Sequence, residues 1–475
     1  MNNNWSDDDE SPHEECGIIG VFAPNEDVAR MAFFGLFTLQ HRGQEAAGIA
    51  VADGQVMSMH KDVGLVSQIF RPQTLDRLTG HYAIGHTRYS TTGSSLARNA
   101  QPFMIETMHG PLALAHNGNL VNSAELRKKL LEQGVGLSSS SDTEVMTMML
   151  ARTSGNTWSE RIQACMQEWR GAYSLVILTR DCVYAVRDEW GFRPLSIGLL
   201  PHGGFAAASE NCALRTLGCE AIREVKRGEI VTLSGNALVV NQAIRPTNPS
   251  AHCVFEFIYF ARPDHVWDGQ SVHHVRQHLG EQLARETSVQ ADVIIPVPDS
   301  AIPAAIGYSR SSGIPFNDGF IKNRYIGRTF IEPTDSLRKQ GVALKFNVIT
   351  ENVLDKRVFM IDDSIVRGNT IGPMIKLLRT AGAREVHVGV TCPPIAHPCF
   401  MGVDMGRYDD LIAHHRNLEE IRSHIRADSL TYLSLEGMMR AVGRKDGYCQ
   451  ACFTGKYPIN VDLLSAKTGF EKNTK

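Results

Sequence analysis

A short apolar run in the second half of the chain ends in two adjacent aspartates and a loop of small residues. The run Val358–Ile361 leads into Asp362 and Asp363. The loop that follows carries hydroxyl, amide and basic side chains around one glycine: Ser364, Arg367, Gly368, Asn369 and Thr370. Backbone N–H groups at a helix start can close around a phosphate, and paired carboxylates can hold ribose hydroxyls or a hard cation such as Mg²⁺. An ordinary acidic turn with a helix cap is the alternative, and the loop matches neither a P-loop nor a GxGxxG fingerprint.

Cysteines near the end of the chain form a second pattern with chemical potential. Cys449 and Cys452 make a CxxC in YCQACFTGKYP, and Cys253 and Cys399 are the best additional ligands. Four thiolates suit either Zn²⁺ or a [4Fe-4S] cluster, and the spacing does not choose between these metals and four unrelated cysteines. Five other cysteines have no motif around them and are expected in the core: Cys165, Cys182, Cys212, Cys219 and Cys392.

Cys16 opens an apolar stretch, ECGIIGVFA, that predicts a buried strand. A buried strand cysteine is the common role for such a residue. A cysteine that is the first residue of its chain can do more, because its own α-amino group, with a pKa of about 8, can serve as a base beside the thiol. An amide nitrogen is not a base, so this chemistry requires removal of residues 1–15.

Two kinds of fold must position these residues. The first half predicts helices over 31–40 and 123–133 among strands in GIAVAD, MSMHKD, AIGHTRYST, LALAHNGNL and YSLVILT. The polar stretch 235–250 predicts a linker, with the domain boundary near residue 248. Beyond it, ADVIIPVPDS and KRVFMIDDS are each followed by a helical pattern, and EVHVGVT completes a βαβ unit. The second half therefore predicts a parallel sheet with helices on both faces.

The composition limits the classes of protein. A chain of 475 residues is too long for one ordinary core, so two domains of about 200 residues are expected. A net charge of -3 argues against general nucleic-acid binding. The start, MNNNWSDDDESPHEE, lacks the basic and apolar regions of a signal peptide, and no segment is apolar enough to span a membrane. A cytoplasmic protein without membrane attachment is expected.

The segment VFMIDDSIVRGNT resembles the signature of type I phosphoribosyltransferases, which bind phosphoribosyl pyrophosphate. The resemblance implies that Asp362 and Asp363 face the ribose hydroxyls and metal, while Ser364 to Thr370 cradle the 5-phosphate. It also implies that Ser300, in VPDSAIPAAIGY, helps position one Mg²⁺ per subunit. On the residues alone, Ser300 is more simply a helix N-cap.

The segment IKNRYIGRTFIEPTDSLRKQGVALKFN carries many cations and little apolar periodicity. In type I phosphoribosyltransferases the corresponding segment is a mobile loop that closes over the substrate, which implies contacts from Lys322 and Arg328. Closure would exclude water from the ribosyl centre. A solvated charged face is the alternative.

The first half is similar to the N-terminal-nucleophile glutamine amidotransferases, because it carries ECGIIGVF, LQHRGQEAAGIA, GHTRYSTTG, AHNGNLVN and SSSDTE in order. The similarity makes Cys16 the nucleophile. It implies that Arg88 pairs with the glutamine α-carboxylate and Asp142 with its α-ammonium, while Asn117 and Gly118 stabilise the oxyanion. Without the family resemblance, Arg88 would be interpreted as a surface charge, Asp142 as a helix cap and Asn117–Gly118 as a hairpin turn. Three histidines are assigned packing or hydrogen-bonding roles: His41, His86 and His116.

The whole chain resembles the amidophosphoribosyltransferase family, in its iron-sulfur-containing branch. That resemblance implies an N-terminal-nucleophile αββα sandwich over 16–248 after removal of 1–15, a phosphoribosyltransferase domain over 249–465 and a polar tail over 466–475. One branch of the family has cysteines in these same contexts and bears a cluster, whereas another branch lacks it. The resemblance therefore implies one structural [4Fe-4S] cluster per subunit on Cys253, Cys399, Cys449 and Cys452.

The resemblance implies a reaction as well: ammonia from glutamine is transferred to C1 of phosphoribosyl pyrophosphate, giving 5-phosphoribosylamine, glutamate and pyrophosphate. An enclosed ammonia passage would form when the loop over 322–345 closes. Inhibition by purine nucleotides and a tetrameric or dimeric assembly are family expectations. Other amidotransferases are opposed by the second half, which lacks their acceptor domains. A silent regulator that senses phosphoribosyl pyrophosphate is opposed by the intact nucleophile set and by the lack of a basic DNA-binding appendage.

Overall fold

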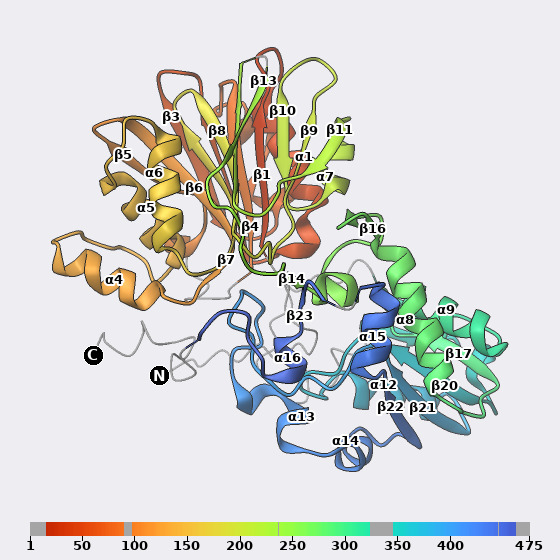
Figure 1. Ribbon diagram of the computed structural model, residues 1–475. Coiled ribbons are helices and arrows are strands. Elements are labelled where there is room, and N and C mark those ends of the chain that lie inside the picture. Colours follow the sequence, from red (N-terminus) through yellow and green to blue (C-terminus); the bar gives the residue numbers. More distant parts are fainter. Residues whose placement is uncertain (1–15, 90–96, 236, 324–344, 445, 462–475) are drawn as a thin grey trace, which may run out of the picture.

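The protein folds into two lobes joined in one chain (Figure 1). The computed structural model describes residues 16–89, 97–235, 237–323, 345–444 and 446–461. Residues up to about 242 form the first lobe and those from about 252 onward the second. Within the described ranges, no helix combines the length and the apolar character needed to cross a membrane.

The first lobe contains a seven-stranded antiparallel sheet. Its strands, in spatial order, are β11 (Glu220–Glu224), β9 (Ser196–Leu199), β10 (Phe205–Ala208), β1 (Gly17–Phe22), β4 (Tyr82–Arg88), β2 (Ala46–Ala52) and β3 (Met57–Val63). All residues of β1 are buried, because this strand lies in the middle of the sheet and is covered on both faces. Its run of apolar and small residues therefore reflects two-sided burial.

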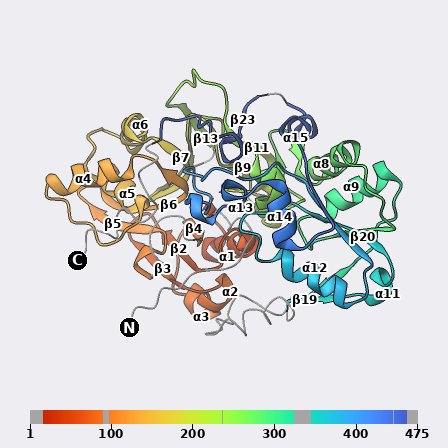
Figure 2. The same ribbon diagram turned by 90° about the horizontal axis from the view of Figure 1, so that it is seen from below.

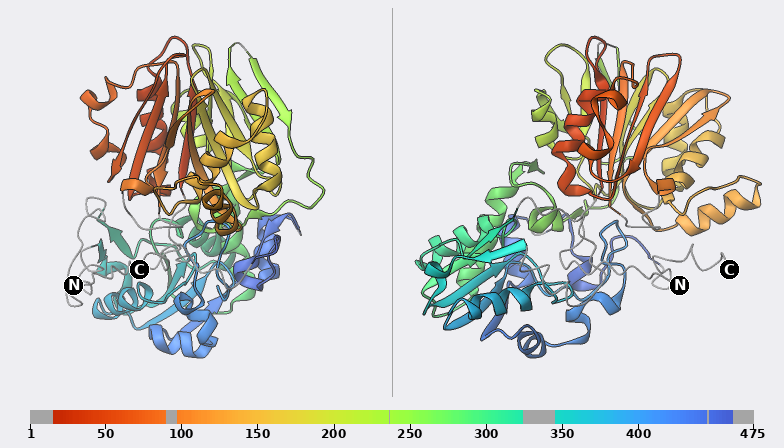
Figure 3. Two further views of the ribbon diagram at one scale, coloured as in Figure 1. Left: turned by 90° about the vertical axis from the view of Figure 1, so that its left-hand side faces the viewer. Right: turned by 180° about the vertical axis from the view of Figure 1, so that it is seen from behind.

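A six-stranded antiparallel sheet packs against the first, as Figure 3 shows. Its strands, in spatial order, are β13 (Ala237–Gln242), β12 (Glu229–Ser234), β8 (Cys182–Arg187), β7 (Gly171–Thr179), β6 (Gly110–Leu120) and β5 (Phe103–Thr107). Branched side chains from both sheets, such as Ile18, Ile84 and Val176, fill the space between them. Face-to-face burial of this kind removes apolar surface from water and stabilises the sandwich.

Helices cover the outer face of each sheet. On the first sheet, α1 (Val28–Thr38) and α7 (Asn211–Thr216) share one apolar core with its strands. On the second sheet lie α4 (Ser123–Glu132), α5 (Asp142–Arg152) and α6 (Trp158–Glu168). Two short helices, α2 (Val66–Ile69) and α3 (Pro72–Leu75), complete the described part of the lobe. This arrangement confirms the predicted αββα sandwich.

The polar stretch predicted as a linker is partly a strand. Residues 237–242 form β13, which pairs antiparallel with β12 at the edge of the second sheet. No residue of this strand is buried, so its sequence lacks the alternation of a strand with one buried face. The prediction of a linker was wrong for residues 237–242, because edge pairing depends on the partner strand and not on local pattern.

The second lobe is built on a parallel sheet of four strands. Their order is β17 (Val293–Pro296), β20 (Arg357–Asp362), β21 (Glu385–Val390) and β22 (Ser429–Tyr432). Figure 2 shows α8 (Val272–Glu286), α9 (Ile302–Ser312) and α15 (Leu435–Val442) on one side of this sheet, and α12 (Ile371–Thr380) on the other. The predicted parallel sheet with helices on both faces is confirmed.

The two lobes meet through buried polar and apolar contacts. Arg42 is 1% exposed and donates to Glu210 of its own lobe and to Glu256 of the second lobe, each at 2.6 Å. A small apolar core joins residues from both sides, among them Ala172, Phe192 and Met401. The interface is therefore desolvated, and each carboxylate of the ion network keeps a cationic partner.

Candidate active site

The predicted nucleophile is buried directly before β1. Cys16 is 6% exposed, and its thiol donates to the carbonyl oxygen of Tyr89 at 3.4 Å. Its own carbonyl accepts a hydrogen bond from Arg42 Nε at 3.3 Å. Burial raises the pKa of the Cys16 thiol to about 11. The thiol therefore stays protonated at neutral pH, and a free α-amino group would supply the missing base.

Arg88 lies beside Cys16 because of strand register. It ends β4, and β4 pairs with β1 so that Thr87 stands opposite Gly17. Arg88 is 3% exposed, and burial lowers its pKa while the carboxylates of Glu45 and Asp142 oppose that change. The cation and the thiol thus share one desolvated environment.

Asp142 is the matching anion, at the first residue of α5. Its Oδ2 accepts the Leu120 N–H at 3.1 Å and lies 3.6 Å from His116 Nδ1. Burial alone would raise the pKa of Asp142, but His116 and the backbone N–H groups hold it below its ordinary value. The carboxylate is therefore ionised at neutral pH, as binding of an α-ammonium group requires.

Asn117 and Gly118 lie in β6. The ring Nε2 of His86, on β4 of the first sheet, lies 3.1 Å from the carbonyl oxygen of His116, and this hydrogen bond connects β6 to the first sheet. The buried Asn117 Nδ2 has no hydrogen-bond partner among the described residues. Gly118 has φ +144, and a Cβ there would lie 2.0 Å from Ala172 O, so no larger residue fits. A buried amide donor without a partner is costly, which fits a donor kept for an oxyanion.

The second group of candidate residues lies at the carboxyl end of β20. Asp363 is 5% exposed, and its two carboxylate oxygens accept from the hydroxyls of Ser300 and, at 2.6 Å, Ser364. Burial raises the pKa of Asp363, although both serines and Arg276 oppose the rise. Ser300 lies in the turn that follows β17, the strand next to β20, so the carboxyl ends of these two strands gather three of the predicted residues.

Ser300 does not cap a helix, which settles one alternative. Helix α9 begins at Ile302 and its N-cap position is Ala301, without a side-chain cap. The hydroxyl of Ser300 bonds instead with Asp363. Hydroxyl and carboxylate oxygens are ligands that Mg²⁺ accepts, so the residues fit a hard cation.

The loop after Asp363 turns sharply before α12. Gly368 has φ +81, a left-handed conformation that favours glycine, and a Cβ there would lie 2.6 Å from the Ile412 side chain. Thr370 occupies the N-cap position of α12, and Asn369 precedes it. The loop thus presents a helix N-terminus beside the carboxylates, the geometry that suits a phosphate.

The basic residues are placed only in part. Arg367 Nη2 lies 3.8 Å from Asp410 Oδ2. Lys322 ends β18 (Phe320–Lys322), and its Nζ lies 2.9 Å from Asp299 Oδ2, next to Ser300 in the chain. Arg328 and most of the predicted closing loop over 322–345 lie outside the described residues, as do 1–15 and 466–475.

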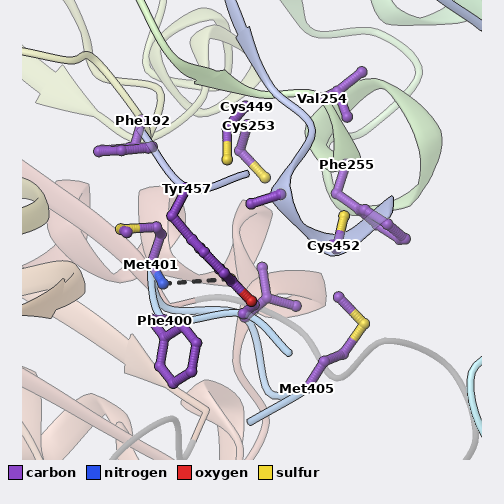
Figure 4. A pocket seen from close by; sticks show the side chains of 13 residues that line it. Phe192, Cys253, Val254, Phe255, Phe400, Met401, Met405, Cys449, Cys452 and Tyr457 are labelled. Atoms are coloured by element: carbon purple, nitrogen blue, oxygen red, sulfur yellow. Dashed lines mark hydrogen bonds between the residues drawn. The ribbon is translucent and has the colours of Figure 1, made fainter. Parts of the chain in front are cut away.

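The four cysteines predicted as ligands line one cavity at the lobe interface (Figure 4). Cys253 stands opposite Cys449 because β14 (His252–Cys253) pairs in parallel with β23 (Tyr448–Cys449). Cys399 and Cys452 join them, and apolar side chains such as Phe192 line the rest. In the part of the chain that the structure describes, no three metal-binding side chains are gathered as tightly as a formed site requires. Four thiols around one apolar cavity nonetheless fit a thiolate-bound metal centre.

The remaining cysteines and the histidines have the predicted structural roles. The five cysteines without a motif are all buried: Cys165, Cys182, Cys212, Cys219 and Cys392. His41 bonds with Glu210 at 2.7 Å, and His86 and His116 bond with backbone carbonyls. The sequence did not reveal that Arg42 holds the Cys16 carbonyl, although Arg42 lies within the motif LQHRGQEAAGIA.

Comparison with known proteins covers both lobes. A glutamine amidotransferase domain model matches residues 86–216, and a phosphoribosyl transferase domain model matches residues 268–400. The amidophosphoribosyltransferase of Synechococcus elongatus is 47% identical, over 95% of this chain and 92% of that protein. The amidophosphoribosyltransferase of Bacillus subtilis is 44% identical, over 94% of this chain and 95% of that protein.

A solved structure has the same fold. The glutamine phosphoribosylpyrophosphate amidotransferase from B. subtilis, complexed with ADP and GMP, gives a TM-score of 0.89 at 43% identity, over 95% of this chain and 99% of that chain. Both lobes, in the same order, are therefore included in the match. The chain belongs to the amidophosphoribosyltransferase family.

Proposed function

We propose that this protein transfers ammonia from glutamine to C1 of phosphoribosyl pyrophosphate, giving 5-phosphoribosylamine, glutamate and pyrophosphate. This reaction is the first step of de novo purine synthesis. The observation that carries the proposal is the presence, in one chain, of two separate sets of buried polar residues. One set surrounds Cys16 and the other surrounds Asp363.

In the first half-reaction, Cys16 attacks the side-chain amide of glutamine after removal of residues 1–15 frees its α-amino group. Arg88 holds the α-carboxylate and Asp142 the α-ammonium, which fixes the amide carbon against the thiolate. The Asn117 amide and the Gly118 N–H donate to the oxyanion. Ammonia leaves, and water then hydrolyses the thioester to glutamate.

In the second half-reaction, ammonia displaces pyrophosphate from C1 of the ribose. Asp362 and Asp363 would hold the ribose hydroxyls and the metal, while Ser364, Arg367, Gly368, Asn369 and Thr370 bind the 5-phosphate. Lys322 supplies positive charge toward the pyrophosphate, and Arg328 is proposed with it by family resemblance alone. Ser300, Asp362 and Asp363 would hold Mg²⁺, which would supply positive charge against the pyrophosphate. Purine nucleotides are proposed as inhibitors, and the protein as a cytoplasmic homo-oligomer, either tetramer or dimer.

The function is tested by measuring pyrophosphate release with each substrate alone and with both together. We expect release only when glutamine and phosphoribosyl pyrophosphate are both present, with one glutamate formed for each pyrophosphate. Release that ignores glutamine would contradict an amidotransferase. Glutamate formation without any pyrophosphate release would point instead to a different acceptor.

We propose that the cavity lined by Cys253, Cys399, Cys449 and Cys452 holds a [4Fe-4S] cluster. The role of this cluster is structural, because the reaction itself needs no electron transfer. Protein purified without oxygen should contain about four iron and four sulfide per chain. A Cys452→Ser variant should lose both, whereas Cys219→Ser, at a buried cysteine outside the cavity, should retain them. Zinc, or an absence of metal, would contradict the assignment.

A further inference from the structure

Three consecutive residues of the second lobe contact the first lobe at or near β6, the strand that carries the proposed oxyanion donors. Asn119 Nδ2 donates to Phe400 O at 2.9 Å. Arg193, which is fully buried, donates to Met401 O from Nη2 at 2.6 Å and from Nε at 3.2 Å. Gly402 follows and packs on the backbone of Gly118. Each residue of this short segment is thus attached to the first lobe by a different contact.

The contact between Gly402 and Gly118 leaves no spare room. A Cβ built on Gly402 would lie 2.9 Å from the Gly118 carbonyl carbon and 3.0 Å from its Cα. Real Cβ atoms avoid backbone atoms at such separations, so these two segments of the chain approach as closely as two glycines allow. Gly402 also has φ +103, in the left-handed region. Both its space and its conformation therefore require glycine.

The other side of Gly118 is also occupied. A Cβ on Gly118 would lie 2.0 Å from Ala172 O of β7, its neighbour in the sheet. Gly118 is therefore fixed by β7 through sheet pairing and by Gly402 through close packing. Met401, whose carbonyl accepts from Arg193, is 2% exposed and belongs to the apolar core that joins the lobes.

The same segment begins at one of the cavity cysteines. Met401 N donates to Cys399 Sγ at 3.3 Å, and Cys399 N donates to Met405 O at 2.8 Å. Figure 4 shows Phe400 and Met401 beside the cavity. The backbone that supports Gly118 is therefore the backbone that places Cys399.

We infer that the segment Cys399–Gly402 is a positioning element for the oxyanion hole: it fixes the Gly118 backbone, so that the second lobe sets the geometry of amide hydrolysis in the first. This inference rests on the proposed role of Gly118. Residues of the segment are positioning residues, since none of them is placed against glutamine itself. A donor displaced by a fraction of an ångström stabilises the transition state less than a fixed one.

The test compares Gly402→Ala with Gly203→Ala. Gly203 has φ +92, close to that of Gly402, but a Cβ there would meet nothing within 4 Å. The pair therefore separates the close approach to Gly118 from the strain of a left-handed alanine. Asn119→Ala is the third variant, because it removes the hydrogen bond to Phe400 O without adding an atom.

We expect Gly402→Ala to lower kcat for glutamine hydrolysis by about 10- to 100-fold, part of the effect of losing one oxyanion donor. The KM for glutamine should change less than about twofold, because Arg88 and Asp142 are untouched, and ammonia-dependent pyrophosphate release should be retained. Asn119→Ala should lower the same kcat by a smaller factor. Gly203→Ala should behave as the unmodified protein in all three measurements.

An unchanged kcat in both Gly402→Ala and Asn119→Ala would overturn the inference. Equal losses of glutamine-dependent and ammonia-dependent activity would also overturn it, because the segment would then support the fold and not the hydrolytic site. A loss in Gly203→Ala equal to that in Gly402→Ala would assign the effect to strain alone. If the unmodified protein shows no glutamine-dependent pyrophosphate release, the result contradicts the proposed function itself and not the positioning role of this segment.

Discussion

Replacing Cys16 by alanine should abolish glutamine-dependent formation of phosphoribosylamine while leaving the ammonia-dependent reaction intact. Loss of a catalytic nucleophile lowers turnover by about 10,000-fold or more, because no other group can form the covalent intermediate. Ammonia supplied from solution needs only the site around Asp363, which lies in the other lobe. We expect the ammonia-dependent rate to stay within about twofold of that of the unmodified protein.

Cys182→Ala is a closely matched control. Cys182 has the same 6% exposure as Cys16. Burial raises the pKa of Cys182 to about 11, as it does for Cys16. The two thiols differ in position, since Cys182 begins β8 and faces neither Arg88 nor Asp142 in any described contact. The control should keep both activities. Loss of both activities in Cys16→Ala would contradict two separable sites.

Changing either aspartate at the end of β20 should lower both activities, whereas the change at Cys16 should lower only the glutamine-dependent one. In Asp362→Asn and in Asp363→Asn, glutamine-dependent and ammonia-dependent pyrophosphate release should fall together, each by about 100-fold or more. Both reactions use the same acceptor, so neither can bypass the lost charge. The Asp363 carboxylate also organises the hydroxyls of Ser300 and Ser364, which would lose a charged acceptor.

Asp355→Asn is the control for this pair. Asp355 lies in the same lobe, two residues before β20, and has φ +57, a conformation that asparagine adopts readily. Rates measured over a range of phosphoribosyl pyrophosphate concentrations should show no change for this control. Variants at Asp362 and Asp363 that retained ammonia-dependent activity would show that the acceptor binds elsewhere.

Local pattern was sufficient to predict the elements that carry the candidate site. The apolar run of β20 ends at its aspartates, and the apolar spacing of α12 matches its buried face, so strand, loop and helix follow directly from the sequence. The buried strand after Cys16 is similarly visible, because both faces of β1 are covered. These features depend on neighbours within a few residues.

Contacts between distant segments left no such signal. The partner of Ser300 is Asp363, 63 residues away, and sequence reasoning alone favoured a helix cap. Asn119 and Phe400 are 281 residues apart, and nothing periodic in either segment predicts their contact. Edge strand β13 was missed for the same reason, since its pairing with β12 and not its polarity makes it a strand.

The central claim is that Cys16 acts as the first residue of the mature chain. N-terminal sequencing and intact-mass measurement of catalytically active protein test it directly. We predict that the active chain begins at Cys16 and lacks residues 1–15, because only then does the thiol have an adjacent α-amino base. Active protein that retained Met1 would contradict the account.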